Sequence, residues 1–117
     1  MWLFFLACSI VSEQKTTTTL TDVGTACLAS DTIQVDFETC LSSSCDTLVS
    51  ATCTAELQGD TVVVHAEAVI ESEGNECTDD CGFVSAECAL PEGADPTSML
   101  LEYAGNQTAL GEACPEF

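Results

Sequence analysis

Cysteine is the residue type with most potential for chemistry in this chain of 117 residues, which holds nine cysteines and one histidine. Cysteines at such density serve as metal ligands, catalytic thiols or disulfide partners. Paired C-x-x-C motifs for a zinc site are missing, and Cys77 and Cys81 are spaced C-x-x-x-C, not C-x-x-C as in thiol oxidoreductases. The cysteines therefore predict disulfides, formed in an oxidising, extracellular compartment.

Nine is an odd number, and setting Cys8 aside leaves eight cysteines, enough for four bridges. Alternation along the expected strands places the side chains of Cys53 and Cys88 on the inward face, as a bridge between two sheets requires. We expect four pairs, namely Cys53 with Cys88 through the core, Cys40 with Cys45 and Cys77 with Cys81 in local loops, and Cys27 with Cys114 between the domain ends.

Carboxylates are the second chemically capable group. The densest cluster comprises Glu71, Glu73, Glu76, Asp79 and Asp80, on a loop that Cys77 and Cys81 would constrain. Calcium takes six to eight oxygen ligands, so Glu73, Glu76, Asp79 and Asp80 form a candidate calcium site. The spacing does not match an EF-hand loop, and a solvated acidic loop is the alternative that we favour.

His65 is the remaining candidate for catalysis, and it is expected on the outward face of a strand. The chain has no second histidine to join it and no nucleophile motif near it. Most acidic residues fall in turns that look exposed, whereas acid–base catalysis needs a pair in unequal environments. We therefore expect no enzymatic activity and no cofactor.

The charge restricts the partners, because Lys15 is the only basic residue against 20 acidic ones and the net charge is −19. Nucleic-acid binding depends on neutralising phosphates, so DNA and RNA are excluded as partners. An anionic bilayer surface repels such a chain, which leaves a lipid anchor or apolar contact as the only membrane attachment. The expected partner is a protein or glycan that is basic or bridged by calcium.

The elements that position these residues read as strands. Ile33, Val35 and Phe37 alternate with polar residues, which indicates a strand with one buried face. A hairpin is expected around the turn Gly59-Asp60, with partners whose numbers sum to 119, from Gln58 opposite Thr61 to Val49 opposite Ile70. Its inward pairs include Ala55 with Val64 and Cys53 with Ala66.

Further strands are expected over 82–90, 98–104 and up to Leu110. Together they predict an all-β fold, an antiparallel β-sandwich stapled by disulfides. The Cys53–Cys88 bridge makes it immunoglobulin-like in that one respect, since the immunoglobulin tryptophan and corner tyrosine are missing.

The first residues are apolar up to Ala7, and Phe5-Leu6-Ala7-Cys8 resembles a bacterial lipobox. That resemblance implies a signal-like segment over 1–7, an acylated Cys8, a Thr-rich tether over 8–26 and a β-sandwich domain over 27–117. The run is too short for a membrane-spanning helix. An ordinary hydrophobic strand, or the core of a non-lipidated signal, is the alternative.

Three stretches, Cys40-Leu-Ser-Ser-Ser-Cys45, Cys77-Thr-Asp-Asp-Cys81-Gly and the closing Tyr-x-Gly strand, resemble small cysteine-rich β-domains of bacterial surface lipoproteins. The resemblance implies fold and location but no activity. We expect a non-catalytic binding or coat module at the cell surface, binding through loops 71–81 and 91–96 at one end of the sandwich. The alternative is a freely secreted effector or protease inhibitor that uses the loop 91–96.

Overall fold

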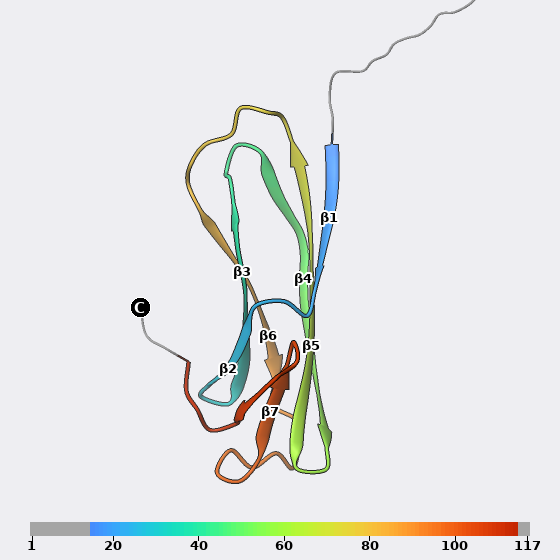
Figure 1. Ribbon diagram of the computed structural model, residues 1–117, viewed down its shortest axis with the longest axis vertical. Coiled ribbons are helices and arrows are strands. Elements are labelled where there is room, and N and C mark those ends of the chain that lie inside the picture. The colour runs from blue at the N-terminus through green and yellow to red at the C-terminus, as the bar shows by residue number, and fades with distance from the viewer. Residues whose placement is uncertain (1–14, 115–117) are drawn as a thin grey trace, which may run out of the picture.

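The computed structural model describes residues 15–114, which form eight strands (Figure 1). This part of the chain contains no helix that is long and apolar enough to cross a membrane. The strands are β1 (Lys15–Thr21), β2 (Thr25–Ala29), β3 (Thr32–Leu41), β4 (Asp46–Gln58), β5 (Thr61–Glu73), β6 (Gly82–Ala89), β7 (Leu100–Tyr103) and β8 (Asn106–Ala109).

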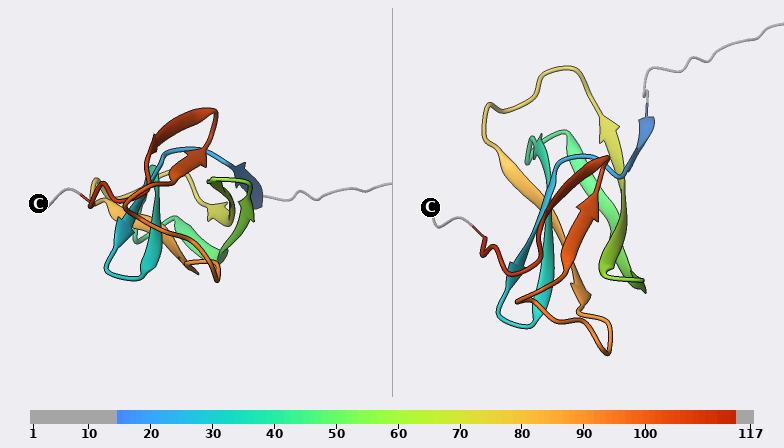
Figure 2. Two further views of the ribbon diagram at one scale, coloured as in Figure 1. Left: turned by 90° about the horizontal axis from the view of Figure 1, so that it is seen from below. Right: turned by 60° about the horizontal axis from the view of Figure 1, so that its bottom comes forward.

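The strands form two sheets packed as layers (Figure 2), which confirms the all-β, sandwich-like fold. One sheet has the order β2-β3-β6. In the other, β5 is central, with β4 along one edge and both β1 and β7 along the other edge.

One pairing departs from the expected antiparallel arrangement, because β7 runs parallel to β5 at Thr61–Val63. The segment between β6 and β7 crosses from one sheet to the other at the end where β5 begins. There the Leu100 amide donates to the Asp60 carbonyl at 3.0 Å. Starting at the same end as β5, β7 has to run in the same direction.

The long hairpin has the expected register from Gln58 opposite Thr61 to Ser50 opposite Val69. The predicted pair of Val49 with Ile70 is wrong, because a bulge makes Leu48 the partner of Ile70. The bulge adds one residue to β4 and shifts the register beyond it. Val49 is left 54% exposed.

The core lies between the facing sheets. Ile33, Val35 and Phe37 of β3 point into it, as their alternation predicts. The other fully buried large side chains are Val62, Val64, Val84 and Leu110. Alternate residues of β3, β5 and β6 are buried, the pattern of two sheets with one solvated face each.

The expected tether over 8–26 is wrong from Lys15 onward, because Lys15–Thr21 is strand β1 and pairs with β5 from Glu73 to Glu67. Threonine is β-branched and suits an extended backbone. Hydrogen bonding to the edge of β5 holds the strand, although six of its seven residues are exposed. Cys8 and the signal-like segment lie outside the described residues.

Four disulfides cross-link the fold. Cys53–Cys88 joins β4 to β6 through the core, and Cys27–Cys114 ties the first and last parts of the domain, both as predicted. The predicted loops Cys40–Cys45 and Cys77–Cys81 are wrong. The bridges are Cys40–Cys81 and Cys45–Cys77, with Cα–Cα distances of 4.7 and 5.5 Å.

The cause of the exchanged partners is strand pairing. Cys40 lies opposite Phe83 in the β3–β6 ladder, close to Cys81. The Glu73 amide donates to the Cys45 carbonyl at 2.8 Å, which brings the chain leading to Cys77 beside Cys45. Four disulfides indicate an oxidising, extracellular or secretory environment for the folded protein.

Candidate binding site

We call residues 40–45 and 73–81 the tip, where the end of β3 leads into β4 and the end of β5 leads into β6 (Figure 1). The two exchanged disulfides join these loops, and side chains add to the connection. Ser42 Oγ lies 3.0 Å from Thr78 Oγ1, and the Thr78 amide donates to Ser44 Oγ at 3.0 Å. The tip is therefore one cross-linked unit and not two independent loops.

Two carboxylates take part in this network. Asp80 accepts hydrogen bonds from Ser43 and Thr78, which lower its pKa to about 2. Asp46, at the base of the tip, accepts from Ser72 Oγ at 2.6 Å and from the Ser42 amide at 2.7 Å, and both bonds lower its pKa. Hydrogen bonds to a carboxylate favour its charged form, so both groups keep their negative charge to a lower pH than an unpaired aspartate does.

The expected calcium ligands Glu73, Glu76, Asp79 and Asp80 are all exposed, and they do not converge. Within residues 15–114, no group of three or more acidic, histidine or cysteine side chains is arranged to hold a metal ion. Asp80 turns toward Ser43 and Thr78 instead, because these donors are held close by the disulfides.

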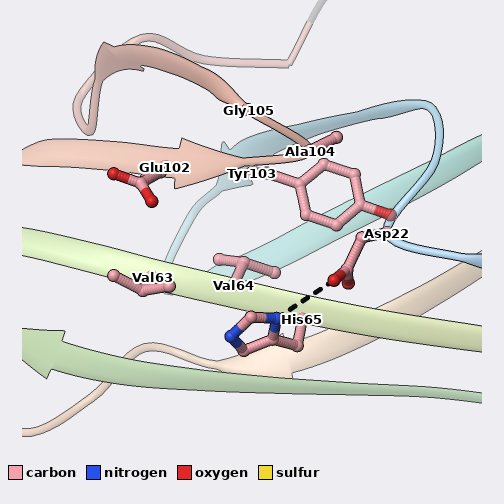
Figure 3. Close-up of a pocket in the computed structure, with 8 residues that line it drawn as sticks. All are labelled: Asp22, Val63, Val64, His65, Glu102, Tyr103, Ala104 and Gly105. Atoms are coloured by element: carbon pink, nitrogen blue, oxygen red, sulfur yellow. Dashed lines mark hydrogen bonds and ion pairs between the residues drawn. The ribbon is translucent and has the colours of Figure 1, made fainter.

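A shallow depression of about 340 Å³ lies where β1 leaves the edge of β5 and β7 joins it (Figure 3). His65 is on the exposed face, as predicted, and its Nδ1 lies 3.1 Å from Asp22 Oδ2. The other oxygen of Asp22 accepts from the Ala66 amide at 2.8 Å, and the Asp22 amide donates to the Ala66 carbonyl. Asp22 therefore continues the hydrogen bonding to β5 after β1 ends, so its role here is to hold the sheet edge.

Tyr103 borders the same depression and points toward the β1–β2 connection (Figure 3). Its hydroxyl donates to the Val23 carbonyl at 2.6 Å. Burial, with a further contribution from the negative charge of Asp22, raises the pKa of Tyr103 to about 12. The phenol is thus a fixed hydrogen-bond donor between β7 and the β1–β2 link. Spacing in the sequence gave no signal for this contact or for the pairing of Asp22 with His65.

The loops 71–81 and 91–96 were expected together at one end of the sandwich, and this expectation is wrong. The first belongs to the tip, and the second lies at the opposite end, beside the β4–β5 turn (Figure 1). The near approach of Gly93 to Leu57 fixes that position. A strand of eight residues, β6, separates the two loops and carries the chain from one end to the other.

Phe83 is the residue that sequence reasoning missed. Its side chain is 82% exposed, on the outer face of β6 directly after the tip. Binding was expected through loops at one end of the sandwich, whereas Phe83 lies on an outer sheet face. The signal was available, because Val84 is inward and its neighbour must then point outward.

No known family model, curated protein or solved structure matches this chain.

Proposed function

We propose that this protein is an exported, non-catalytic binding module at the cell surface whose acidic tip recognises a cationic partner. The observation that carries the proposal is the tip itself. Two disulfides and a set of hydrogen bonds fix loops that add almost nothing to the core. Fixing a loop before binding reduces the entropy that binding must overcome.

The charge of the tip supports a cationic partner. Glu73, Glu76, Asp79 and Asp80 are exposed there. Lys15, on β1, is the only lysine or arginine in the sequence. It lies opposite Glu73 in the β1–β5 ladder, and its Nζ is 3.9 Å from Oε1 of Glu71 on β5. No basic side chain pairs with Glu76, Asp79 or Asp80 among the described residues, and their field steers positively charged partners toward this end.

The lipid anchor at Cys8 is part of the same proposal. Lys15 pairs with Glu73, so the chain enters the described domain at the tip end. Seven residues from Cys8 to Lys15 span at most about 25 Å. An acylated Cys8 would hold the tip within that distance of the bilayer, and its partner would be bound close to the membrane. Mass spectrometry of the native N-terminus tests the anchor, since acylation of Cys8 adds two or three fatty acyl chains.

The likeness to immunoglobulin domains also remains a proposal, supported only by the bridge between sheets at Cys53–Cys88. The secreted protease inhibitor is less well supported than the binding module. An inhibitor would use the loop 91–96. In that loop the Asp95 carboxylate accepts hydrogen bonds from the Thr97 hydroxyl at 2.7 Å and the Ser98 hydroxyl at 3.0 Å, which caps two turns. These turns do not present the extended backbone that pairs with another strand in β-augmentation.

The experiment compares charge at the two ends. Binding of a fluorescent oligolysine peptide is measured at about 0.05 and 0.5 M salt, where the Debye length falls severalfold. The triple variant Glu73→Gln, Glu76→Gln, Asp79→Asn removes three of the four exposed carboxylates of the tip, and Asp31→Asn, Asp60→Asn, Glu92→Gln removes the same charge elsewhere. We expect the first to weaken binding at least tenfold and the second at most about threefold. Equal losses would show that total charge, and not the tip, attracts the peptide.

A further inference from the structure

Phe83 is held rigidly although nothing covers its ring within the described residues. Its backbone lies opposite Cys40 in the β3–β6 ladder, and Cys81, two residues earlier, is bonded to Cys40. The side chain is 82% exposed. Large aromatic side chains are enriched in the buried centres of interfaces, and a fixed backbone lowers the cost of using one.

Phe83 lies on the outer face of the β2-β3-β6 sheet, because its neighbour Val84 is buried. Leu48 and Val49 are also exposed, at 39% and 54%, but they belong to β4 of the other sheet. Leu48 is the cross-strand partner of the buried Ile70, and such partners point to the same face, so Leu48 is directed toward the space between the sheets. We therefore call the Phe83 side chain alone the apolar site.

Acidic residues lie beside Phe83 on the outer sheet face. Glu87 points outward like Phe83, because the residues between them alternate with buried Val84, Ala86 and Cys88. Asp36 pairs with Ser85 on the neighbouring strand, and its carboxylate accepts from the Glu38 amide at 2.9 Å. The aromatic ring is thus bordered by negative charge on one side and by the acidic tip on the other.

We propose that the apolar site and its acidic border bind an amphipathic basic polypeptide segment, with its apolar residues on Phe83 and its arginines or lysines on the carboxylates. This inference rests on the proposed function and narrows the partner from any cation to a polypeptide. A cationic side chain can also lie over the face of the Phe83 ring. A second copy of the chain would bring another −19 charges, and an anionic bilayer would also be repelled, so charge complementarity selects a basic polypeptide.

The test uses two synthetic peptides of equal charge, one alternating arginine with leucine and the other alternating arginine with glycine. Their affinities for the full chain are measured by fluorescence anisotropy at low salt. We expect the leucine peptide to bind at least tenfold more tightly. In Phe83→Ser this advantage should fall below about threefold, while Phe83→Trp should keep it. Val23→Ser, which removes a 37% exposed apolar side chain elsewhere, is the matched control and should also keep it.

The possible outcomes separate the two proposals. If both peptides bind and Phe83→Ser leaves the leucine advantage unchanged, the apolar site is overturned and the proposed cationic partner stands. If neither peptide binds the wild-type chain, both proposals fail. Self-association by sedimentation, or binding to zwitterionic vesicles, that is lost in Phe83→Ser without loss of the leucine advantage would assign Phe83 to another occupant and overturn the inference.

Discussion

The body of the sandwich and its tip are held together by different forces. In the body, facing strands bury Ile33, Val35, Phe37 and their partners, so the stabilising free energy scales with apolar area removed from water. At the tip, Cys45 is the only buried apolar residue, and the loops are joined by two disulfides and by serine, threonine and aspartate side chains. Where a protein is too thin to bury a core, covalent bridges replace packing.

The largest difference between the two regions is expected for phenylalanine. Phe37 is 2% exposed in the body and Phe83 is 82% exposed beside the tip. Phe37→Ala should lower the free energy of unfolding by about 4 kcal/mol, through lost transfer energy and the cavity left behind. Phe83→Ala should change it by less than about 0.5 kcal/mol. Urea unfolding of both variants measures the difference, and similar losses would contradict the division into body and tip.

Removing disulfides tests the same division. With the other bridges intact, Cys53–Cys88 closes a loop through residues 45–53 and 77–88, and Cys40–Cys81 a shorter one through 40–45 and 77–81. Chain entropy gives each about 3 kcal/mol. Cys88 is 5% exposed, whereas Cys40 and Cys81 are exposed, so lost packing adds to the first value only. Replacing Cys53 and Cys88 by alanine should therefore cost more than replacing Cys40 and Cys81. The reverse order in denaturant unfolding would mean that the tip bridge supports the core.

Replacing glycine by alanine should cost more stability inside the body, at Gly24, than in the open turn at Gly59. Gly24 has φ +88°, and an added Cβ would lie 1.9 Å from the Asp36 carbonyl oxygen. Gly24→Ala should cost about 3 kcal/mol, because backbone must move. Gly59 has φ +63° with nothing within 4 Å of the added Cβ, so Gly59→Ala carries only the left-handed penalty of about 1 kcal/mol. Thermal unfolding of the two variants tests the order, which would be wrong if Gly59→Ala were the less stable.

The smallest expected effect is the response of the tip to acid. The pKa of Asp80 is about 2 in the folded protein, below the ordinary aspartate value near 3.9 of an unfolded chain. Its contribution to stability is present above about pH 4 and is lost as the pH falls toward 2. Asp80→Asn should reduce the fall in melting temperature over this interval. Asp79→Asn, at the neighbouring position, is the control. If it reduced the fall in melting temperature by the same amount, Asp80 would not be the cause of the acid response.

Several features of the fold could be predicted because they depend on neighbouring residues. Alternation placed Ile33, Val35 and Phe37 inside, and the turn at Gly59 with apolar pairing fixed the hairpin register as far as Ser50. The bulge at Val49 could not be predicted in this way. A bulge leaves no mark in the residue types around it, and it alters only which residues pair beyond it. The strand at Lys15–Thr21 was missed for a related reason. Its stability comes from the open edge of β5, and its own side chains carry no burial pattern.

The sequence by itself determined the acidic composition with one basic residue, the even number of cysteines that remains once Cys8 is set aside, and the alternation of apolar residues that gives strands one apolar face. These properties belong to single residues or to residues a few positions apart, and they led to two of the four bridges. The tertiary structure alone decided which cysteines of the tip meet, that loops 71–81 and 91–96 lie at opposite ends, and that Asp22 reaches Ala66. Such contacts join residues that are many positions apart. They depend on how two twisted sheets align in space, and local spacing carries no information about that alignment.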